Sequence, residues 1–337
     1  MTSISPENWL QVTPTGLYCL PGDFYIDPAR PVDRAVITHG HSDHARSGHR
    51  ATLSTAETAA IMAVRYGVDF AASSETAAYG KTRRIADVDV TLFPAGHILG
   101  SAQILLEYHG SRVVISGDYK RRHDPTCPPF EPIACDVFIT EATFGLPVFR
   151  HPPDELELHR LLQSQKLFPE RCQLVGVYAL GKCQRVMARL REIGYERPIF
   201  LHGALLALTK LYVDRGIDLG HFSVISGMTA NQLKGEIVLC PPSALADRWT
   251  RRLPDPLPAA ASGWMRVRAR ARQGSAELPL IISDHADWDE LLQTTEDVGA
   301  PEVWITHGRE DGLLHALTQR GRRARALSLI GRDEEET

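Results

Sequence analysis

The chain has 337 residues, of which 43% are apolar and 23% are charged, and its formal net charge is −4. This is the composition of an ordinary soluble globular protein with room for one large domain or two of medium size. No apolar run approaches the roughly 18 to 20 residues that a membrane-spanning helix needs, so no membrane partner is predicted. The average charge leaves a nucleic-acid partner open, because a basic face can be hidden within it.

The cysteines favour a reducing compartment. None of the six forms a Cys-x-x-Cys pair, and residues 1–6 lack the basic and apolar regions of a secretory signal. A cytoplasmic protein is therefore expected. The six are Cys19, Cys127, Cys135, Cys172, Cys183 and Cys240.

The first part of the chain reads as short strands separated by Gly and Pro, with one helix among them. The strands are predicted at 16–20, 23–27, 34–38, 89–93, 103–108, 112–116 and 136–140, and the helix at 56–66. From about Asp154 helices alternate with strands, which predicts a parallel α/β unit. Its helices are predicted at 154–165, 182–193 and 204–212, and its strands at 174–178 and 198–201.

The last part of the chain is predicted to return to the first domain. Residues 241–273 carry Pro, Ala and Arg without clear helical periodicity. A strand at 280–283, a helix at 288–298 and a strand at 302–306 follow.

The tract Thr38-His39-Gly40-His41-Ser42-Asp43-His44 directly follows an apolar run and predicts a metal site. In an extended segment alternate side chains point the same way, so His39, His41 and Asp43 are expected to converge, with His44 turning in where a helix begins. Imidazole and carboxylate ligands suit zinc, manganese or iron, and four of them so close together exceed what one tetrahedral ion takes from one loop. The alternative is a solvated histidine-rich patch, which seldom has this spacing behind a buried-type strand.

Four later strand ends supply further candidate side chains of the same kinds. Each follows or borders an apolar run, and taken singly each is more often a hydrogen-bonded core residue or part of a capped turn. Together with the first cluster they form a much stronger signal. They are His97, Asp118, His285 and His307.

These motifs resemble the metallo-β-lactamase superfamily, whose signature is His-x-His-x-Asp-His followed by a histidine, an aspartate and a late histidine. The resemblance narrows to the β-CASP nucleases. Their motifs A, B and C are similar to Thr140-Glu141-Ala142-Thr143, Ser283-Asp284-His285-Ala286-Asp287 and Thr306-His307-Gly308. The tract 178–184 is similar to the turn that opens a helix of their inserted module.

The resemblance implies a four-layer αββα metallo-β-lactamase fold of the α/β class, with a short β-CASP-like α/β cap inserted late. The expected domains are 1–170 and 275–337 for the metallo-β-lactamase part and 171–274 for the cap. The resemblance also implies two divalent metal ions, Zn²⁺ or Mn²⁺. One is held by His39, His41 and His97, the other by Asp43, His44 and His307, with Asp118 bridging and Asp27 behind the ligands.

Such a pair of ions, about 3.5 to 4 Å apart, lowers the pKa of a bridging water and supplies hydroxide for phosphodiester hydrolysis. The expected catalytic residues are Asp43, His285 and Glu141. With Glu141 orienting it, His285 would contact the phosphate or protonate the leaving group.

Basic residues late in the chain predict how a nucleic acid is held. In an extended conformation four alternating arginines would form one charged face, for which the alternative is a solvated edge strand. Three nearby arginines and a tryptophan suit a groove for a single strand or a frayed end. The residues are Arg266, Arg268, Arg270 and Arg272, then Arg248, Arg251, Arg252 and Trp264. The turn at Gly181, with Lys182, is a weaker candidate for a phosphate contact.

The resemblance points to two different substrates, RNA and DNA. His307 is typical of the RNA-processing branch of the family. The tracts 240–244, 262–265 and 283–288 are similar to bacterial exonucleases associated with DNA ligase and helicase genes. A DNA exonuclease of DNA repair is therefore favoured, with a DNA ligase and a helicase as partners implied by the resemblance. The alternatives are an RNA 3′-end-processing nuclease, a small-molecule metallohydrolase and an inactive scaffold subunit.

Overall fold

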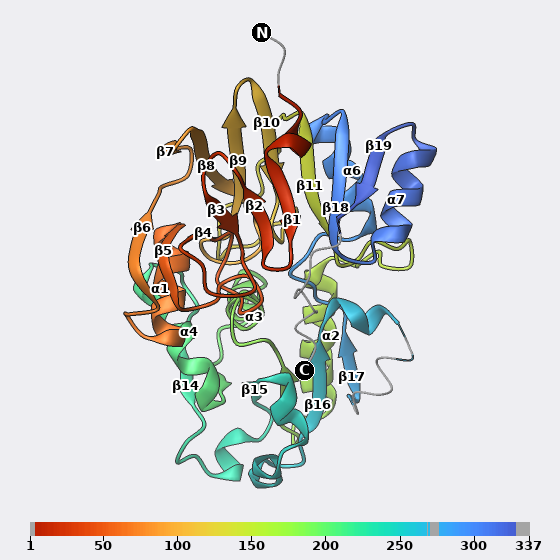
Figure 1. Ribbon diagram of the computed structural model, residues 1–337. Coiled ribbons are helices and arrows are strands. Elements are labelled where there is room, and N and C mark those ends of the chain that lie inside the picture. The colour runs from red at the N-terminus through yellow and green to blue at the C-terminus, as the bar shows by residue number, and fades with distance from the viewer. Residues whose placement is uncertain (1–3, 268, 270–275, 328–337) are drawn as a thin grey trace. The chain divides into compact units, whose positions relative to one another are not determined.

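The computed structural model describes residues 4–267, 269 and 276–327, which form two compact units (Figure 1). The first unit runs to His123, continues over Cys127–Pro147 and resumes at His285, and the second comprises Asp124–Thr126 and Val148–Asp284. These boundaries differ from the expected 171–274. The difference arises because the helix α2, Asp154–Leu167, packs on strands and a helix of the second unit.

Two sheets form the centre of the first unit. Among the described residues, one has six strands in the order β1-β2-β3-β4-β5-β6 and the other has seven in the order β19-β18-β11-β10-β9-β8-β7. The strands of the first sheet are β1 (Leu10–Thr13), β2 (Gly16–Cys19), β3 (Phe24–Ile26), β4 (Arg34–Val36), β5 (His49–Ser54) and β6 (Ala71–Thr76). Those of the second are β7 (Arg83–Ile85), β8 (Val88–Pro94), β9 (Ala102–Tyr108), β10 (Ser111–Ile115), β11 (Val137–Ala142), β18 (Glu302–Gly308) and β19 (Arg323–Ala326).

Alternation along the strands builds the layers of this unit. On β11, Val137 and Ile139 point into the core shared by both sheets, whereas Phe138 lies in a cluster with Val298 of a covering helix. On β4, Val36 joins the shared core while its neighbours face the first helix. Because successive side chains of a strand point to opposite faces, each sheet is covered on both sides.

The outer layers are helices. Residues of α1 (Ala56–Tyr66) pack on the outer face of the first sheet, and α6 (Trp288–Val298) and α7 (Glu310–Gln319) pack on that of the second. The α1 boundaries are those predicted, because Thr55 caps the helix by accepting a hydrogen bond from the Thr58 backbone N–H. The predicted αββα order is confirmed.

The second unit is built on one parallel sheet. Among the described residues its order is β14-β13-β15-β12-β16-β17, and every pairing is parallel. The strands are β12 (Gln173–Gly176), β13 (Ile199–Leu201), β14 (Phe222–Val224), β15 (Ile237–Cys240), β16 (Leu257–Ala261) and β17 (Leu278–Leu280). The helices that accompany them are α2, α3 (Lys182–Glu192) and α4 (Leu206–Asp214). In the described part of the chain no helix combines the length and the apolar character needed to cross a bilayer.

Candidate metal centre

The loop that follows β4 carries the first four candidate ligands and lies against α1. A Cβ at Gly40 would come within 2.5 Å of the Ile61 side chain, so only glycine permits this approach. A guanidinium N–H of Arg65, also on α1, donates to the Gly40 carbonyl at 2.9 Å. The loop turns at once, since the Ala45 backbone N–H donates to the His41 carbonyl at 2.7 Å.

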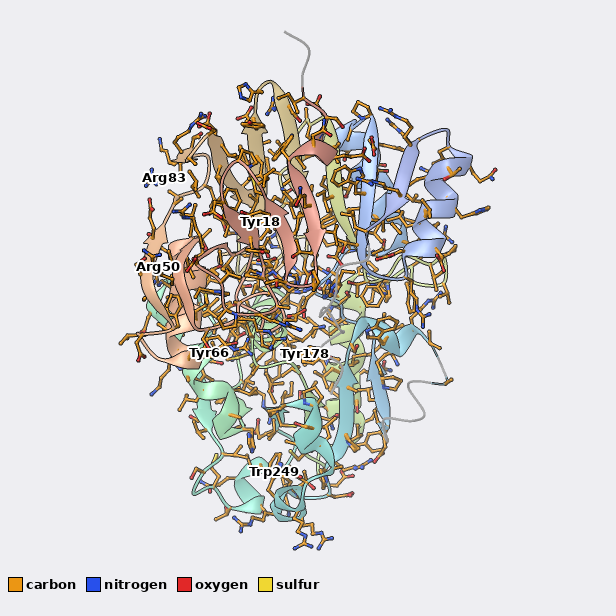
Figure 2. The ribbon with its side chains drawn as sticks, viewed as in Figure 1. Tyr18, Arg50, Tyr66, Arg83, Tyr178 and Trp249 are labelled. Carbon is orange, nitrogen blue, oxygen red and sulfur yellow. The ribbon has the colours of Figure 1, made fainter. Side chains whose placement is uncertain are left out.

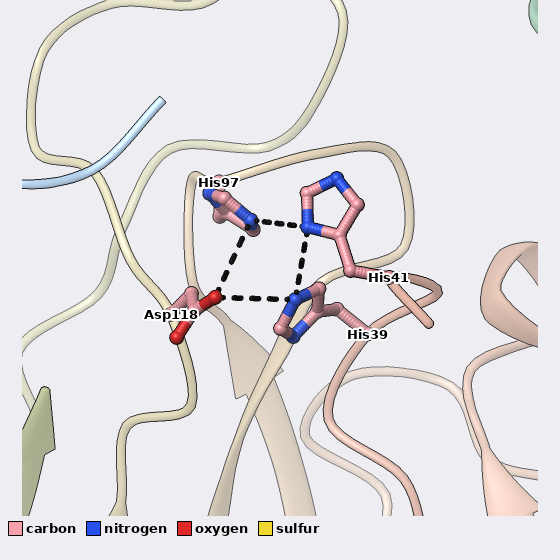
Figure 3. A group of neighbouring side chains, drawn as sticks. All are labelled: His39, His41, His97 and Asp118. Carbon is pink, nitrogen blue, oxygen red and sulfur yellow. Dashed lines mark hydrogen bonds and ion pairs between the residues drawn. The ribbon is translucent and has the colours of Figure 1, made fainter. Parts of the chain in front are cut away.

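Three imidazoles and a carboxylate form the first group of ligand atoms (Figure 3). His41 Nδ1 lies 3.2 Å from His39 Nε2 and 3.0 Å from His97 Nε2. Asp118 Oδ2 lies 3.4 Å from His39 Nε2 and 3.9 Å from His97 Nε2. Four donor atoms thus surround one point, which is the arrangement that a tetrahedral cation requires.

Asp43, His44 and His307 form a second group. His44 Nε2 lies 3.3 Å from Asp43 Oδ2, and the rings of His44 and His307 lie 5.8 Å apart. Simple strand alternation had predicted Asp43 beside His39 and His41, and no helix begins at His44. That prediction was wrong because the loop turns after His41, which sends Asp43 and His44 to a separate cluster.

Asp118 joins the two groups. Its Oδ2 atom, which faces His39 in the first group, also lies 3.4 Å from His44 Nε2 in the second. Asp118 Oδ1 is buried and has no hydrogen-bond partner among the described residues, while the buried His44 Nε2 faces the carboxylates of Asp43 and Asp118. Buried polar atoms are costly without a partner, so two divalent cations fit this set of donors.

The electrostatics of the site favour bound cations. Burial, assisted by His44, lowers the pKa of His39 to about 4, and burial also holds the pKa of His97 well below its usual value. Both rings are therefore neutral at pH 7, as metal ligands must be. Burial alone lowers the pKa of His44, but Asp118 and Asp43 outweigh it and raise that pKa well above its usual value. The carboxylates thus concentrate negative charge where a cation would bind.

Asp27 lies behind His44 and fixes its ring. Asp27 Oδ2 lies 2.8 Å from His44 Nδ1, and its two oxygens accept hydrogen bonds from the Thr38 backbone N–H at 2.7 Å and the Thr38 hydroxyl at 2.5 Å. With Nδ1 held in this way, His44 presents Nε2 to the second group. Asp27 adopts a left-handed backbone with φ of 43°.

Replacing Asp27 by asparagine is expected to weaken metal binding about 10- to 100-fold, because the charge that orients His44 is lost. Asparagine tolerates the left-handed backbone, so the loop should keep its shape. Competition against a chelator would measure the affinity. The matched control is Asp33→Asn, an exposed carboxylate of the same unit. Equal affinity of Asp27→Asn and wild type would exclude this orienting role.

A β-bulge places His307. The register between β11 and β18 shifts between Thr140 and Ala142, so that Thr306 and His307 together oppose Glu141. His307 has φ of 62°, and a Cβ at the next residue, Gly308, would come within 2.5 Å of the Ala142 carbonyl. Bulges and left-handed residues of this kind re-aim side chains at functional sites.

His285 and Glu141 form a pair beside the first ligand group. His285 Nδ1 lies 2.9 Å from Glu141 Oε2, and the His285 and His97 ring centroids are 4.8 Å apart. Glu141 is buried and accepts hydrogen bonds from the Tyr119 backbone N–H at 2.7 Å and the Thr143 hydroxyl at 2.6 Å. Because His285 Nδ1 contacts Glu141, Nε2 is the ring nitrogen that would contact a phosphate or transfer a proton.

The structure places several predicted substrate residues differently. The Gly181 N–H donates to the Gln184 side chain at 2.9 Å, and the Lys182 ammonium is buried, donating to the Ile282 carbonyl at 2.9 Å. Both groups therefore bond to other residues of the second unit. The ring of Trp264 is largely buried and packs edge-on against Phe149, with ring centroids 4.9 Å apart.

The predicted extended row of arginines does not begin at Arg266, because the chain is helical there. Arg266 ends a 3-10 helix that begins at Gly263, because Ser262 caps that turn by accepting from the Trp264 backbone N–H. Arg268, Arg270 and Arg272 lie outside the described residues. By contrast, Arg248, Arg251 and Arg252 are all exposed on one 3-10 helix.

Three supporting residues were not predicted from the sequence. Thr38 bonds both Asp27 and His39, Thr143 bonds Glu141, and Arg65 holds the Gly40 carbonyl. Thr38 directly precedes the candidate ligand His39, and Thr143 lies two residues after Glu141. Their positions in these tracts would have allowed a supporting role to be predicted. The role of Arg65 could not be predicted from the sequence, because Arg65 lies on α1, twenty-five positions from Gly40 in the chain.

The fold and the paired ligand groups define a metallo-β-lactamase-like α/β protein. A solved structure of a protein of unknown function from Enterococcus faecalis matches with a TM-score of 0.58 and 13% identity, covering 88% of this chain and 80% of that one. This likeness supports the fold alone. No family model matches the chain.

Sequence relatives support the resemblance to the β-CASP nucleases. The chain is 32% identical over 317 residues, 93% of its length, to a Probable DNA ligase of Opitutus terrae, and it spans 30% of that protein. It is 37% identical over 123 residues to Endoribonuclease YSH1 of Saccharomyces cerevisiae, which is 35% of this chain and 15% of the relative. Cleavage and polyadenylation specificity factor 73 of Drosophila melanogaster matches at 32% over 130 residues, 37% of this chain and 18% of the relative.

Proposed function

We propose that this protein is a metal-dependent hydrolase of phosphodiester bonds in nucleic acid. The observation that carries the proposal is the shared carboxylate of Asp118, which faces His39 in one ligand group and His44 in the other. Two neighbouring divalent ions, Zn²⁺ or Mn²⁺, would activate a water molecule and neutralise charge on the phosphate and the leaving oxygen. The first group would hold one ion and the second group the other.

The chain's own residues orient these ligands and supply a proton. Asp27 keeps the Nε2 atom of His44 turned toward the second group, and burial keeps His39 and His97 neutral. His285, held at Nδ1 by Glu141, donates a proton from Nε2 to the departing oxygen. The side chain of His285 is 21% exposed while that of Glu141 is 1% exposed, so the imidazole is the member of the pair that substrate can reach.

Replacing His285 by alanine is expected to lower hydrolysis about 10²- to 10⁴-fold while metal content stays unchanged. A phosphodiester with a p-nitrophenolate leaving group needs no proton donor, so its hydrolysis should fall much less. Rates on this ester and on an oligonucleotide, with metal analysis of both proteins, make the measurement. Loss of bound metal, or equal losses on the two substrates, would exclude the proton-donor role.

DNA is the polymer that we propose. The match to the Probable DNA ligase covers 93% of the chain and therefore includes most of the second unit, whereas the matched region of YSH1 covers 35%. Exonuclease action in DNA repair, beside a ligase or helicase, follows from the resemblance of three tracts in the last third of the chain. RNA processing is the second candidate function, because 123 residues of the chain are 37% identical in sequence to an endoribonuclease.

End-labelled DNA and RNA strands of one sequence would separate these candidates. Stepwise shortening of DNA, with RNA left intact, is the expected result and gives the polarity of cleavage. Shortening or internal cleavage of RNA, with DNA left intact, would instead identify an RNA-processing nuclease. A substrate blocked at both ends provides the control, because an exonuclease leaves it intact and an endonuclease cuts it.

A further inference from the structure

A cavity of about 280 Å³ lies within the second unit, at the carboxyl ends of β13 and β14. In parallel α/β sheets this edge is where ligands bind. The floor of the cavity is apolar, with Leu233 and Leu253 buried and Met228 packed against them. The wall is formed by His202, Trp249 and Arg252. A ligand with a flat apolar part would fit this lining.

Two aromatic rings in the wall are held in fixed orientations. Trp249 is labelled in Figure 2, and its indole N–H donates to the Ala244 carbonyl at 2.9 Å. His202 Nδ1 accepts a hydrogen bond from the Ala204 backbone N–H at 3.2 Å. The two ring centroids are 5.1 Å apart, and both rings are partly exposed. Rings oriented in advance offer a stacking surface at little entropic cost.

Positive charge gathers on the same turn. Arg248, Arg251 and Arg252 belong to one 3-10 helix with Trp249, and all three are exposed. None forms an ion pair with a carboxylate among the described residues. Most of the other arginines described in this unit are paired with a carboxylate. These paired residues are Arg160, Arg171, Arg185, Arg189 and Arg197.

We propose that this cavity binds an unpaired nucleobase of the substrate, stacked on Trp249, with the adjoining phosphates held by Arg252 and its two neighbours. The proposal rests on the proposed nuclease function and names a second place where the strand is held. A planar apolar ring beside negative charge is the chemistry of a nucleotide, and aromatic stacking together with guanidinium contacts is how proteins hold single strands. A free mononucleotide has the same chemistry.

Binding can be measured on the full chain in the presence of a chelator, which prevents cleavage. The probes are a fluorescent single-stranded DNA oligonucleotide and an abasic strand of equal length, with unlabelled dAMP as competitor. Trp249→Leu is expected to weaken binding of the normal strand about 5- to 150-fold and to leave the abasic strand unchanged. Trp249→Phe should retain most of the affinity. Arg252→Gln should weaken both strands and reduce the salt dependence by about 0.7 of a logarithmic slope.

The matched control is Arg50→Gln, an exposed arginine of the first unit (Figure 2), which should bind both strands as wild type does. Competition by micromolar dAMP would support the cavity and identify a free nucleotide as its ligand. Wild-type affinity in Trp249→Leu, or equal losses on normal and abasic strands, would overturn the proposal while leaving the nuclease function intact. A wild-type protein that neither binds nor cleaves any strand would instead overturn the nuclease function.

Discussion

Replacing Asp118 by asparagine is expected to lower phosphodiester hydrolysis by at least about a thousandfold, because both ligand groups lose their common charge. Asp118 Oδ2 faces His39 in the first group and His44 in the second at 3.4 Å each, so one carboxylate lies against both groups. Burial alone would raise the pKa of Asp118, but His44 and His39 outweigh it and hold that pKa well below its usual range. A neutral amide cannot replace this carboxylate.

The metal content of each variant should be measured after gel filtration, alongside its rate of hydrolysis. Asp118→Asn is expected to retain less metal than His97→Ala or His307→Ala, since each of those changes touches one group. Asp136→Asn is the control, because Asp136 is exposed directly before β11 and belongs to neither ligand group, and asparagine can still accept the hydrogen bond from the Arg112 backbone N–H. Full activity of Asp118→Asn with a full metal complement would show that the two groups do not share this residue.

The second large effect is expected on stability. Arg185 is 1% exposed, and its guanidinium lies 2.7 Å from Asp284 Oδ1, 3.3 Å from Asp154 Oδ2 and 3.5 Å from Asp124 Oδ2. The Arg185→Met variant keeps much of the volume but removes the cation that these buried carboxylates share. Unfolding free energy should fall by about 3 to 5 kcal/mol, the cost of breaking a buried ion pair from one side.

Urea unfolding followed by tryptophan fluorescence would measure this loss. Arg189→Met is the matched control on the same helix, where a pair with Glu192 near the surface is worth about 1 kcal/mol or less. Arg185 also donates to the Ser283 carbonyl, two residues before His285 in the chain, so hydrolysis should fall as well. A loss below about 1 kcal/mol in Arg185→Met would show that the cluster is no more stabilising than a surface pair.

The candidate metal ligands could be proposed from the sequence because they lie in short polar tracts at the ends of apolar runs. Such runs become neighbouring strands, and polar residues at their ends meet at one edge. His39, His41 and His97 meet Asp118 in this way, although their partition from Asp43 came only from the resemblance. Strand alternation failed there because it assumes an extended chain, and a turn closes after His41.

Long-range partners explain what could not be predicted. Lys182 opens a helix, where a basic residue suggests a phosphate contact, but its ammonium is buried on Asp284, about a hundred positions away. The bulge that aims His307 depends on the register between β11 and β18, which no local pattern contains. Likewise, the Arg248–Arg252 turn is basic in sequence, yet only the fold places its Trp249 beside His202.

The central claim is tested most directly by metal depletion and reconstitution. The full chain, stripped with a chelator and then supplied with Mn²⁺ or Zn²⁺, would be assayed on end-labelled single-stranded DNA beside an Asp43→Ala variant treated in the same way. Cleavage that disappears on depletion, returns with metal and stays absent in Asp43→Ala is the predicted result. Cleavage that persists in the stripped protein, or that Asp43→Ala retains in full, would contradict a metal-dependent nuclease built on these residues.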